Sequence, residues 1–167
     1  NNPNTWRHIV VNMLDDGTME MYYDGTKQSL SSNTIWVTYY SQQIRLGRSV
    51  LTSDYFEGSI DEVIYFNKSL TQDEVTALYD YSKTAYTYDG TCQSNRDCKV
   101  DEACIYDQCM ANVTGFWSMD DFNETHVLDE SGNGRDATLN NDAQISLEGI
   151  NERQLVLDGN GDYLEVE

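Results

Sequence analysis

Basic residues are scarce in this chain of 167 residues. Ten Lys and Arg stand against 29 Asp and Glu, which gives a formal net charge of −19 at pH 7. Such an acidic surface repels the phosphates of nucleic acids and the headgroups of anionic lipids. We therefore exclude nucleic acid as a partner. Divalent cations and basic partners suit this surface better, although a solvated acidic face explains the charge equally well.

Long apolar runs are also missing. No stretch of eighteen apolar residues occurs, so the sequence predicts no insertion into a membrane. Proline occurs once, at Pro3, and no proline-rich linker is present. Twelve tyrosines and three tryptophans favour half-buried, pleated surfaces, so the composition indicates β-structure.

Patterns typical of catalysis are absent. The sequence has no Gly-x-Ser-x-Gly motif and no phosphate-binding loop. His8 and His126 are isolated from any nucleophile in the sequence. A retaining glycosidase needs two carboxylates on one face, whereas Asp61 and Glu62 are adjacent and would lie on opposite faces of a strand. We therefore expect no enzymatic activity.

Cysteine is confined to one short stretch. Four cysteines within eighteen residues predict two disulfides in a small, loop-rich knot, and four cysteines allow three pairings. Zinc is the alternative, but zinc sites favour pairs of cysteines with two residues between them. Here five, five and four residues lie between successive cysteines. The predicted disulfide cysteines are Cys92, Cys98, Cys104 and Cys109.

Disulfides imply an oxidising compartment. Three glycosylation motifs agree with that, with acceptors at Asn67, Asn112 and Asn123. The sequence therefore predicts an extracellular or cell-surface location.

The first segment reads as several strands followed by one short helix. Asp24-Gly25 predicts a tight hairpin turn, because glycine accepts the positive φ that such turns need. Thr71 and Glu74 form a capping box that opens a helix, with Val75 and Leu78 on its apolar side. The predicted strands are Thr5–Leu14, Met19–Tyr23, Ile35–Tyr40, Gln43–Gly47 and Tyr55–Phe66.

The last segment carries over half of the net charge. Residues 113–167 contain thirteen acidic and two basic residues. Phe116–Met119, Gln154–Leu157 and Tyr163–Val166 are predicted strands. A loop rich in Asp, Gly and Asn is expected after the first of them.

Both segments resemble parts of a laminin-G-like, concanavalin-A-like domain. The pieces that resemble its C-terminal half are Trp6–Val11, Met21–Gly25, Ile44–Arg48, Phe56–Val63 and Leu70–Glu74. The pieces that resemble its N-terminal part are Gly115–Asp120, Asp129–Gly134 and Leu155–Leu164. The resemblance implies an all-β, antiparallel β-sandwich of the jelly-roll type with one short helix and a small disulfide-rich insert.

The order of the parts is reversed relative to such a domain. Residues 1–85 resemble the C-terminal part, 86–112 form the cysteine knot, and 113–167 resemble the N-terminal part. Three arrangements are consistent with this order. The chain is an excerpt from a tandem array in which one repeat ends and the next begins, or a permuted sandwich whose two halves pair with each other. Alternatively, it is a subunit that exchanges strands with its neighbours. The excerpt from an array is the simplest of the three.

The resemblance also implies a calcium ion near the seam between the first and last strands of the sandwich. Asp61 and Asp120 are the expected first ligands, with Asn133 and Asp158 next, because calcium takes oxygen donors. An EF-hand at Asp129 is rejected, since its twelfth position lacks a glutamate. Turn formation explains the same residues equally well.

We interpret the chain as a structural or adhesive module of a surface filament or adhesin, stabilised by calcium. Its expected partners are neighbouring copies of the chain or adjacent repeats. The alternative is a carbohydrate-binding module that would bind glycans. Loop aromatics would then stack on sugar rings, and the candidates are Tyr39, Tyr40, Tyr55 and Tyr163.

Overall fold

The structure is a computed structural model in which two compact units are distinguished. Unit 1 is Asn1–Thr38 with Lys68–Gly90, and unit 2 is Tyr39–Asn67 with Thr91–Glu167. The structure describes residues 5–30, 43–49, 52–83, 92–99, 102–106, 108–150 and 152–166. The strand predicted at Ile35–Tyr40 lies outside the described residues.

Unit 1 contains a three-stranded antiparallel sheet. Its strands are β1 (Ile9–Met13), β2 (Met19–Tyr23) and β3 (Thr26–Lys27), in the order β1-β2-β3. The turn between β2 and β3 has a positive φ at both Asp24 (49°) and Gly25 (74°). Such a turn matches the twist of an antiparallel hairpin, so the hairpin prediction is confirmed.

The helix α1 (Gln72–Lys83) follows a capping box. The N–H of Glu74 donates to Thr71 Oγ1 at 3.3 Å, and the N–H of Thr71 donates to Glu74 Oε2 at 2.8 Å. Both of these backbone donors lack a partner within the helix, and the box supplies one to each. The predicted start of the helix is confirmed.

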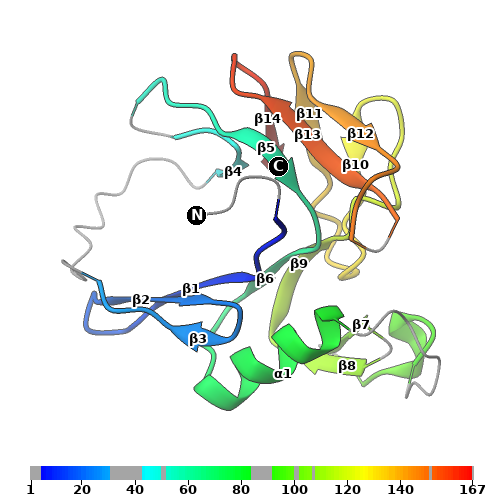
Figure 1. Cartoon of the computed structure of the whole chain (residues 1–167). Helices are drawn as coiled ribbons and strands as arrows, with labels where there is room; N and C mark the ends of the chain where they lie inside the picture. Colours follow the sequence, from blue (N-terminus) through cyan, green and yellow to red (C-terminus); the bar gives the residue numbers. More distant parts are fainter. Residues whose placement is uncertain are drawn as a thin grey trace. The chain divides into compact units, whose positions relative to one another are not determined.

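One face of the sheet in unit 1 packs on the helical segment (Figure 1). The side chain of Asn12 donates to Leu70 O at 2.7 Å and accepts from the N–H of Leu70 at 3.1 Å. Tyr22 on β2 and Val75 and Leu78 on α1 are buried. The chain before α1 is therefore fixed to β1 by a paired hydrogen bond as well as by apolar contact.

Acid should weaken the start of α1 through Glu74. Lys68 and the N–H of Thr71, both bonded to this carboxylate, lower the pKa of Glu74 to about 2. Stability from Glu74 is therefore complete above its unfolded pKa of 4.5 and is lost as the pH falls towards 2. Because its side chain is 40% exposed, solvent screens the ion pair. Glu74→Gln should then cost only about 0.5–1 kcal/mol at pH 7.

Urea unfolding of the wild type and Glu74→Gln at pH 7, 4 and 2.5 measures this difference. The two proteins should converge at the lowest pH. Asp73→Asn is the matched control, because it removes a first-turn carboxylate outside the capping box. Equal losses for both variants at every pH would show that the helix dipole, and not the box, is responsible.

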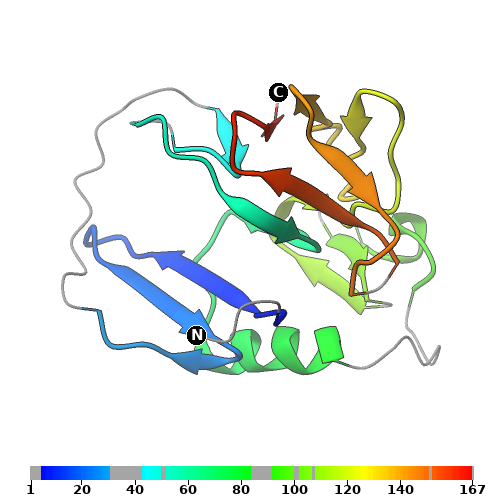
Figure 2. The ribbon, with the colours of Figure 1, turned by 45° about the horizontal axis from the view of Figure 1, so that its top comes forward.

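Unit 2 brings residues from the first and last parts of the chain into shared ladders. Its strands are β4 (Ile44–Leu46), β5 (Glu57–Ile60), β6 (Val63–Phe66), β7 (Glu102–Ile105), β8 (Gln108–Ala111), β9 (Val113–Trp117), β10 (His126–Val127), β11 (Ala137–Asn140), β12 (Gln144–Ser146), β13 (Gln154–Asp158) and β14 (Tyr163–Val166). β5 pairs with β13, β4 with β14 and β6 with β9, all antiparallel. Figure 2 shows β5 alongside β13. Strands from residues 44–66 thus pair with strands from residues 113–166.

Two sheets of unit 2 share an apolar core. One has the order β10-β11-β14-β4 and the other β12-β13-β5. Trp117, Met119, Val127, Leu155 and Leu164 are fully buried in a cluster that draws on both sheets. The fold is therefore the predicted all-β, antiparallel sandwich, and the described residues include one α-helix. No helix in the described ranges is long and apolar enough to span a membrane.

Two details of the sequence prediction are wrong. The single strand expected at Tyr55–Phe66 is divided into β5 and β6, which join different sheets. Glu62 has a φ of 54°, and this left-handed residue turns the chain between the two strands. The loop expected after β9 also contains three short strands, β10, β11 and β12.

Candidate functional site

Asp61 and Asp120 lie at the same end of the β6–β9 ladder. Val63 pairs with Trp117 there, so Asp61 precedes one strand and Asp120 follows the other. Both carboxylates bind the loop between β12 and β13. Asp61 Oδ2 accepts from the N–H of Ile150 at 2.7 Å, and Asp120 Oδ1 accepts from the N–H of Arg153 at 3.0 Å.

Negative charge is concentrated at this end of unit 2. Burial raises the pKa of Asp120, and the negative charge of Glu152 raises it further. The hydrogen bond from the N–H of Arg153 lowers this pKa but does not outweigh the other two effects. Burial also raises the pKa of Glu130, although a bond from Ser118 opposes it. The carboxylates are hard oxygen donors, which fit the calcium ion that the resemblance implies. Among the described residues, Asp61 and Asp120 do not belong to a group of three such side chains within 4.8 Å of one another, and calcium here stays a prediction.

Asn133 has a structural role in the loop after β10. Its amide group donates to Val113 O at 3.2 Å and to Ser131 Oγ at 3.0 Å. Asp129 organises the same loop by accepting from the N–H groups of Phe116, Ser131 and Arg135. Burial alone would raise the pKa of Asp129, but these bonds lower it. The spacing that resembles an EF-hand therefore forms a hydrogen-bonded turn.

Asp158 lies away from the other predicted ligands. It pairs with Glu57 at one end of the β5–β13 ladder, whereas Leu155 pairs with Ile60, next to Asp61, at the other end. At about 3.3 Å per residue these ends are roughly 10 Å apart, and Asp61 lies one residue further along. Asp158 instead lies with Asp142 and Asp162. The turn that contains Asp158 and Asp162 is visible in the sequence, but nothing local connects it with Asp142.

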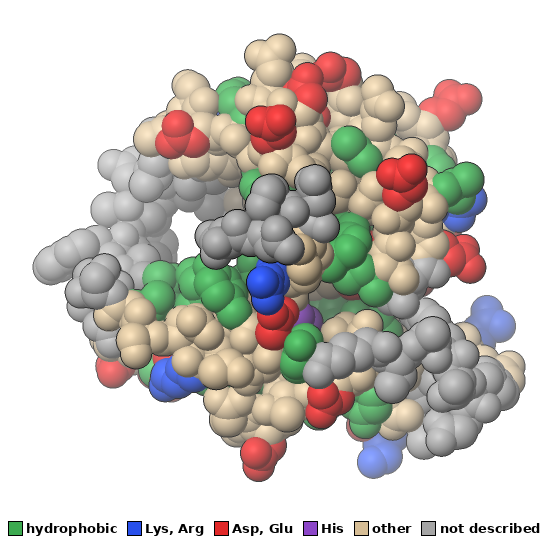
Figure 3. Space-filling model, viewed as in Figure 1, with side chains coloured by type: hydrophobic (Ala, Val, Ile, Leu, Met, Phe, Trp, Pro, Cys, Tyr) green, Lys and Arg blue, Asp and Glu red, His purple; other side chains and the backbone are tan. Residues whose placement is uncertain are grey.

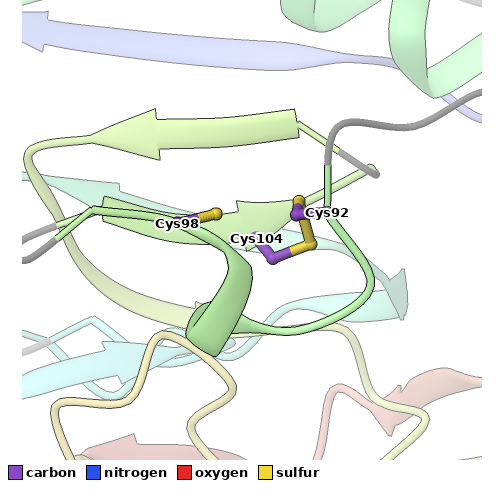
Figure 4. Close-up of side chains that lie close together, drawn as sticks. All are labelled: Cys92, Cys98 and Cys104. Carbon is purple, nitrogen blue, oxygen red and sulfur yellow. A yellow bond between two sulfur atoms is a disulfide. The ribbon is translucent and has the colours of Figure 1, made fainter.

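All four cysteines form disulfides in unit 2. Cys92 bonds Cys104 and Cys98 bonds Cys109, with Cα–Cα distances of 5.9 and 5.4 Å. Figure 4 shows the first of these bonds with the sulfur of Cys98 beside it. Sulfur that is bonded to sulfur is not a thiolate, so zinc has no ligand here. The disulfide prediction is confirmed, and the structure chooses one of the three pairings.

The predicted glycosylation acceptors occupy exposed positions. Asn67 and Asn112 are both exposed and are joined by a backbone bond, in which the N–H of Asn67 donates to Asn112 O at 3.0 Å. Asn123 is exposed as well, and its side-chain oxygen accepts from the N–H groups of Thr125 and His126. Glycosylation at these sites stays a prediction.

Two of the predicted aromatic residues surround an arginine. The Arg48 guanidinium lies 5.6 Å from the ring centroid of Tyr55 and 4.9 Å from that of Tyr163. Arg45 also lies over the Tyr163 ring, at 5.7 Å, and pairs with Glu165 at 2.9 Å. Tyr39 and Tyr40 fall outside the described residues.

An apolar row runs along the face of the unit 1 sheet that α1 does not cover. Side chains alternate between the two faces of a strand, and Ile9, Val11 and Met13 of β1 are 56%, 50% and 56% exposed. The residues that pair with them are Tyr23, Met21 and Met19. Apolar side chains gather over β1 and β2 in Figure 3, while Asp and Glu dominate the charged side chains of the visible surface.

The first part of the chain matches a protein-family model. The model, described as the concanavalin A-like lectin/glucanases superfamily of laminin-G type, matches residues 1–76. Residues 1–76 belong to a laminin-G-like domain. The laminin-G-like match ends before 113–167, where the resemblance stays a prediction. No curated protein and no solved structure matches the chain significantly.

Proposed function

We propose that this laminin-G-like chain is an extracellular structural or adhesive module that associates with neighbouring copies of itself. The apolar row on β1 and β2 is the observation that carries the proposal. Disulfides and laminin-G-like domains are typical of extracellular proteins, which supports the location. Calcium would act as a stabilising ion rather than as part of a reaction.

The row consists of uncharged residues only. Its six members are Ile9, Val11, Met13, Met19, Met21 and Tyr23. A contiguous apolar patch that stays exposed to water is unfavourable and is typical of an interaction surface. The rest of the chain is strongly acidic, so two copies repel each other except where such uncharged faces meet. A second copy of the chain offers the same apolar row, and we therefore propose it as the partner.

Light scattering after size-exclusion chromatography tests the association. The wild type should be oligomeric at about 100 μM, and Val11→Lys should be monomeric, since it places a charge in the middle of the row. Met13→Lys is a second variant in case the first does not fold, and circular dichroism checks each of them. Leu147→Lys is the matched control, because Leu147 is apolar and 75% exposed but lies in unit 2.

A wild type that stays monomeric at this concentration would overturn the proposal. Dissociation by Leu147→Lys to the same extent would also contradict it, because added charge alone would then account for the effect. Sugar binding is the alternative function, and the Tyr55–Arg48–Tyr163 group favours it, since tyrosine rings stack on sugars. A monomer whose Tm rises with one class of sugar, and not in Tyr163→Ala, would support that alternative.

A further inference from the structure

Two connections between the sheets of unit 2 lie side by side. Residues 141–143 lead from β11 to β12, and residues 159–162 lead from β13 to β14. Each connection crosses from one sheet to the other, because β11 and β14 share one sheet while β12 and β13 share the second. Asn141 Nδ2 donates to Gly161 O, which joins the connections directly. Both connections lie at the top of Figure 1.

Three carboxylates meet at this junction. Asp142 belongs to the first connection, whereas Asp158 ends β13 and Asp162 closes the second connection. One carboxylate oxygen from each residue lies within 4.8 Å of those of the other two. Charges of one sign at such a distance repel strongly, so the group needs a proton or a cation.

Asp162 is the residue whose surroundings favour a ligand. It is only 1% exposed. Its Oδ2 accepts from the N–H of Asp158 at 2.8 Å, while its Oδ1 is buried without any hydrogen-bond partner. A buried carboxylate oxygen without a partner is costly, and proteins commonly satisfy it with a donor or a metal ion.

Protein cations do not neutralise the three carboxylates. None of the described Lys, Arg or His side chains forms an ion pair with Asp142, Asp158 or Asp162. The N–H of Asn160 alone would lower the pKa of Asp158. A hydrogen bond with the Asp162 side chain and the charges of Asp162 and Asp142 outweigh it and raise that pKa.

We propose that Asp142, Asp158 and Asp162 bind a calcium ion that ties the two connections together. Calcium accepts six to eight oxygen ligands at about 2.3–2.6 Å, so oxygens on opposite sides of the ion lie about 5 Å apart. The spacing of the three carboxylates fits that limit. Asp142 and Asp158 are exposed, so water completes the shell. The ion holds both sheets of unit 2 together at this end. Asp158 pairs with Glu57, which lies four residues, or roughly 13 Å, along the strand from Asp61.

Calorimetric titration of the whole chain with CaCl₂, after treatment with a chelator, tests the site. Extracellular modules bind calcium with a Kd on the order of 0.1–1 mM, and we expect a value in this range. Asp142→Asn should weaken this binding at least tenfold, because it removes a charged ligand from an exposed position. Asp158→Asn should do the same, and it serves as the second variant.

Thermal unfolding gives an independent readout. Addition of 5 mM CaCl₂ should raise the Tm of the wild type by about 3 °C, because an ion that binds only the folded state stabilises it. The shift should disappear in Asp142→Asn. Asp121→Asn is the matched control, since Asp121 is an exposed aspartate of unit 2 outside the cluster, and it should keep both the binding and the shift.

Two outcomes would overturn the inference. One is a wild type that shows neither calcium binding nor a change in Tm at 5 mM. The other is binding that survives in Asp142→Asn and Asp158→Asn but is lost in Asp120→Asn, which would assign the ion to the seam between β6 and β9. Neither outcome bears on self-association, so the proposed function is tested separately.

Discussion

Replacing Trp117 with alanine should lower the free energy of unfolding of unit 2 by about 3–5 kcal/mol. Trp117 is fully buried on β9 and belongs to the core shared by the two sheets. Its indole N–H also donates to Arg135 O at 2.9 Å. The alanine variant therefore loses apolar contacts, creates a cavity and leaves a carbonyl group without its donor.

The size of this loss follows from how closely the ring is packed. A Cβ at Gly115 would lie 2.3 Å from the end of the Trp117 ring, so the indole occupies the space above that glycine. Gly115→Ala should consequently destabilise unit 2 as well, because the ring has to move. The two losses should not add fully in the double variant, since both act on one contact.

Urea unfolding followed by far-UV circular dichroism measures these changes without relying on tryptophan fluorescence. Leu147→Ala is the control, because Leu147 is 75% exposed and its truncation should change stability by less than about 0.5 kcal/mol. If Trp117→Ala costs no more than Leu147→Ala, then β9 does not contribute to the core as described. Domains have a free energy of unfolding of only about 5–15 kcal/mol. The expected loss is therefore a large part of the total stability of unit 2.

Removal of either disulfide should be the second large effect. The bonds join cysteines 12 and 11 positions apart, and closing loops of this length contributes about 2–4 kcal/mol. The segment has little else to stabilise it. Its small core contains Ala103 and Ile105, which pack with Val113 and Phe116 of the following strand.

Limited digestion with trypsin distinguishes the oxidised and reduced proteins. Arg96 and Lys99 lie between the cysteines and should become rapidly cleavable in dithiothreitol. The paired replacement of Cys92 and Cys104 with serine should expose the same bonds without a reductant. Cleavage in the sheet of unit 1, at Lys27 on β3, provides the internal control and should not accelerate. Equal rates before and after reduction would contradict a stabilising role for the bridges.

Local rules predicted the elements that end in a turn with special backbone requirements. β2 and β14 begin and end where the sequence places them, because Asp24-Gly25 and the glycine-rich turn before Tyr163 leave little choice. The capping box identified the start of α1 in the same way. These signals operate over four or five residues, which is why the sequence alone reveals them.

Short elements that only their pairing defines were missed. β10 and β12 contain two and three residues, too few for a recognisable alternation, and they are defined by pairing with β11 and β13. The break between β5 and β6 was missed because Glu62 has no preference for a positive φ. Tertiary context imposes that conformation.

The candidate ligands show the same limit. Asp61 and Asp120 were expected near each other because the seam of a laminin-G-like sandwich joins their strands, and β6 does pair with β9. Asp158 and Asp162 were recognisable as an oxygen-rich turn. Asp142 lies on a different connection, and its proximity follows from the crossing of both connections between the sheets, which no local pattern encodes.

The ladders of unit 2 also determine when it can be completed during synthesis. Arg45 on β4 bonds Glu165 on β14, 120 residues later. At the usual 5–20 residues per second, β4 waits roughly 6–24 s for that partner to emerge. Throughout this interval its apolar side chains remain uncovered, and an unpaired strand of this kind is prone to aggregate. The cysteine-rich segment emerges during the same wait and can close its bridges before the sandwich around it exists.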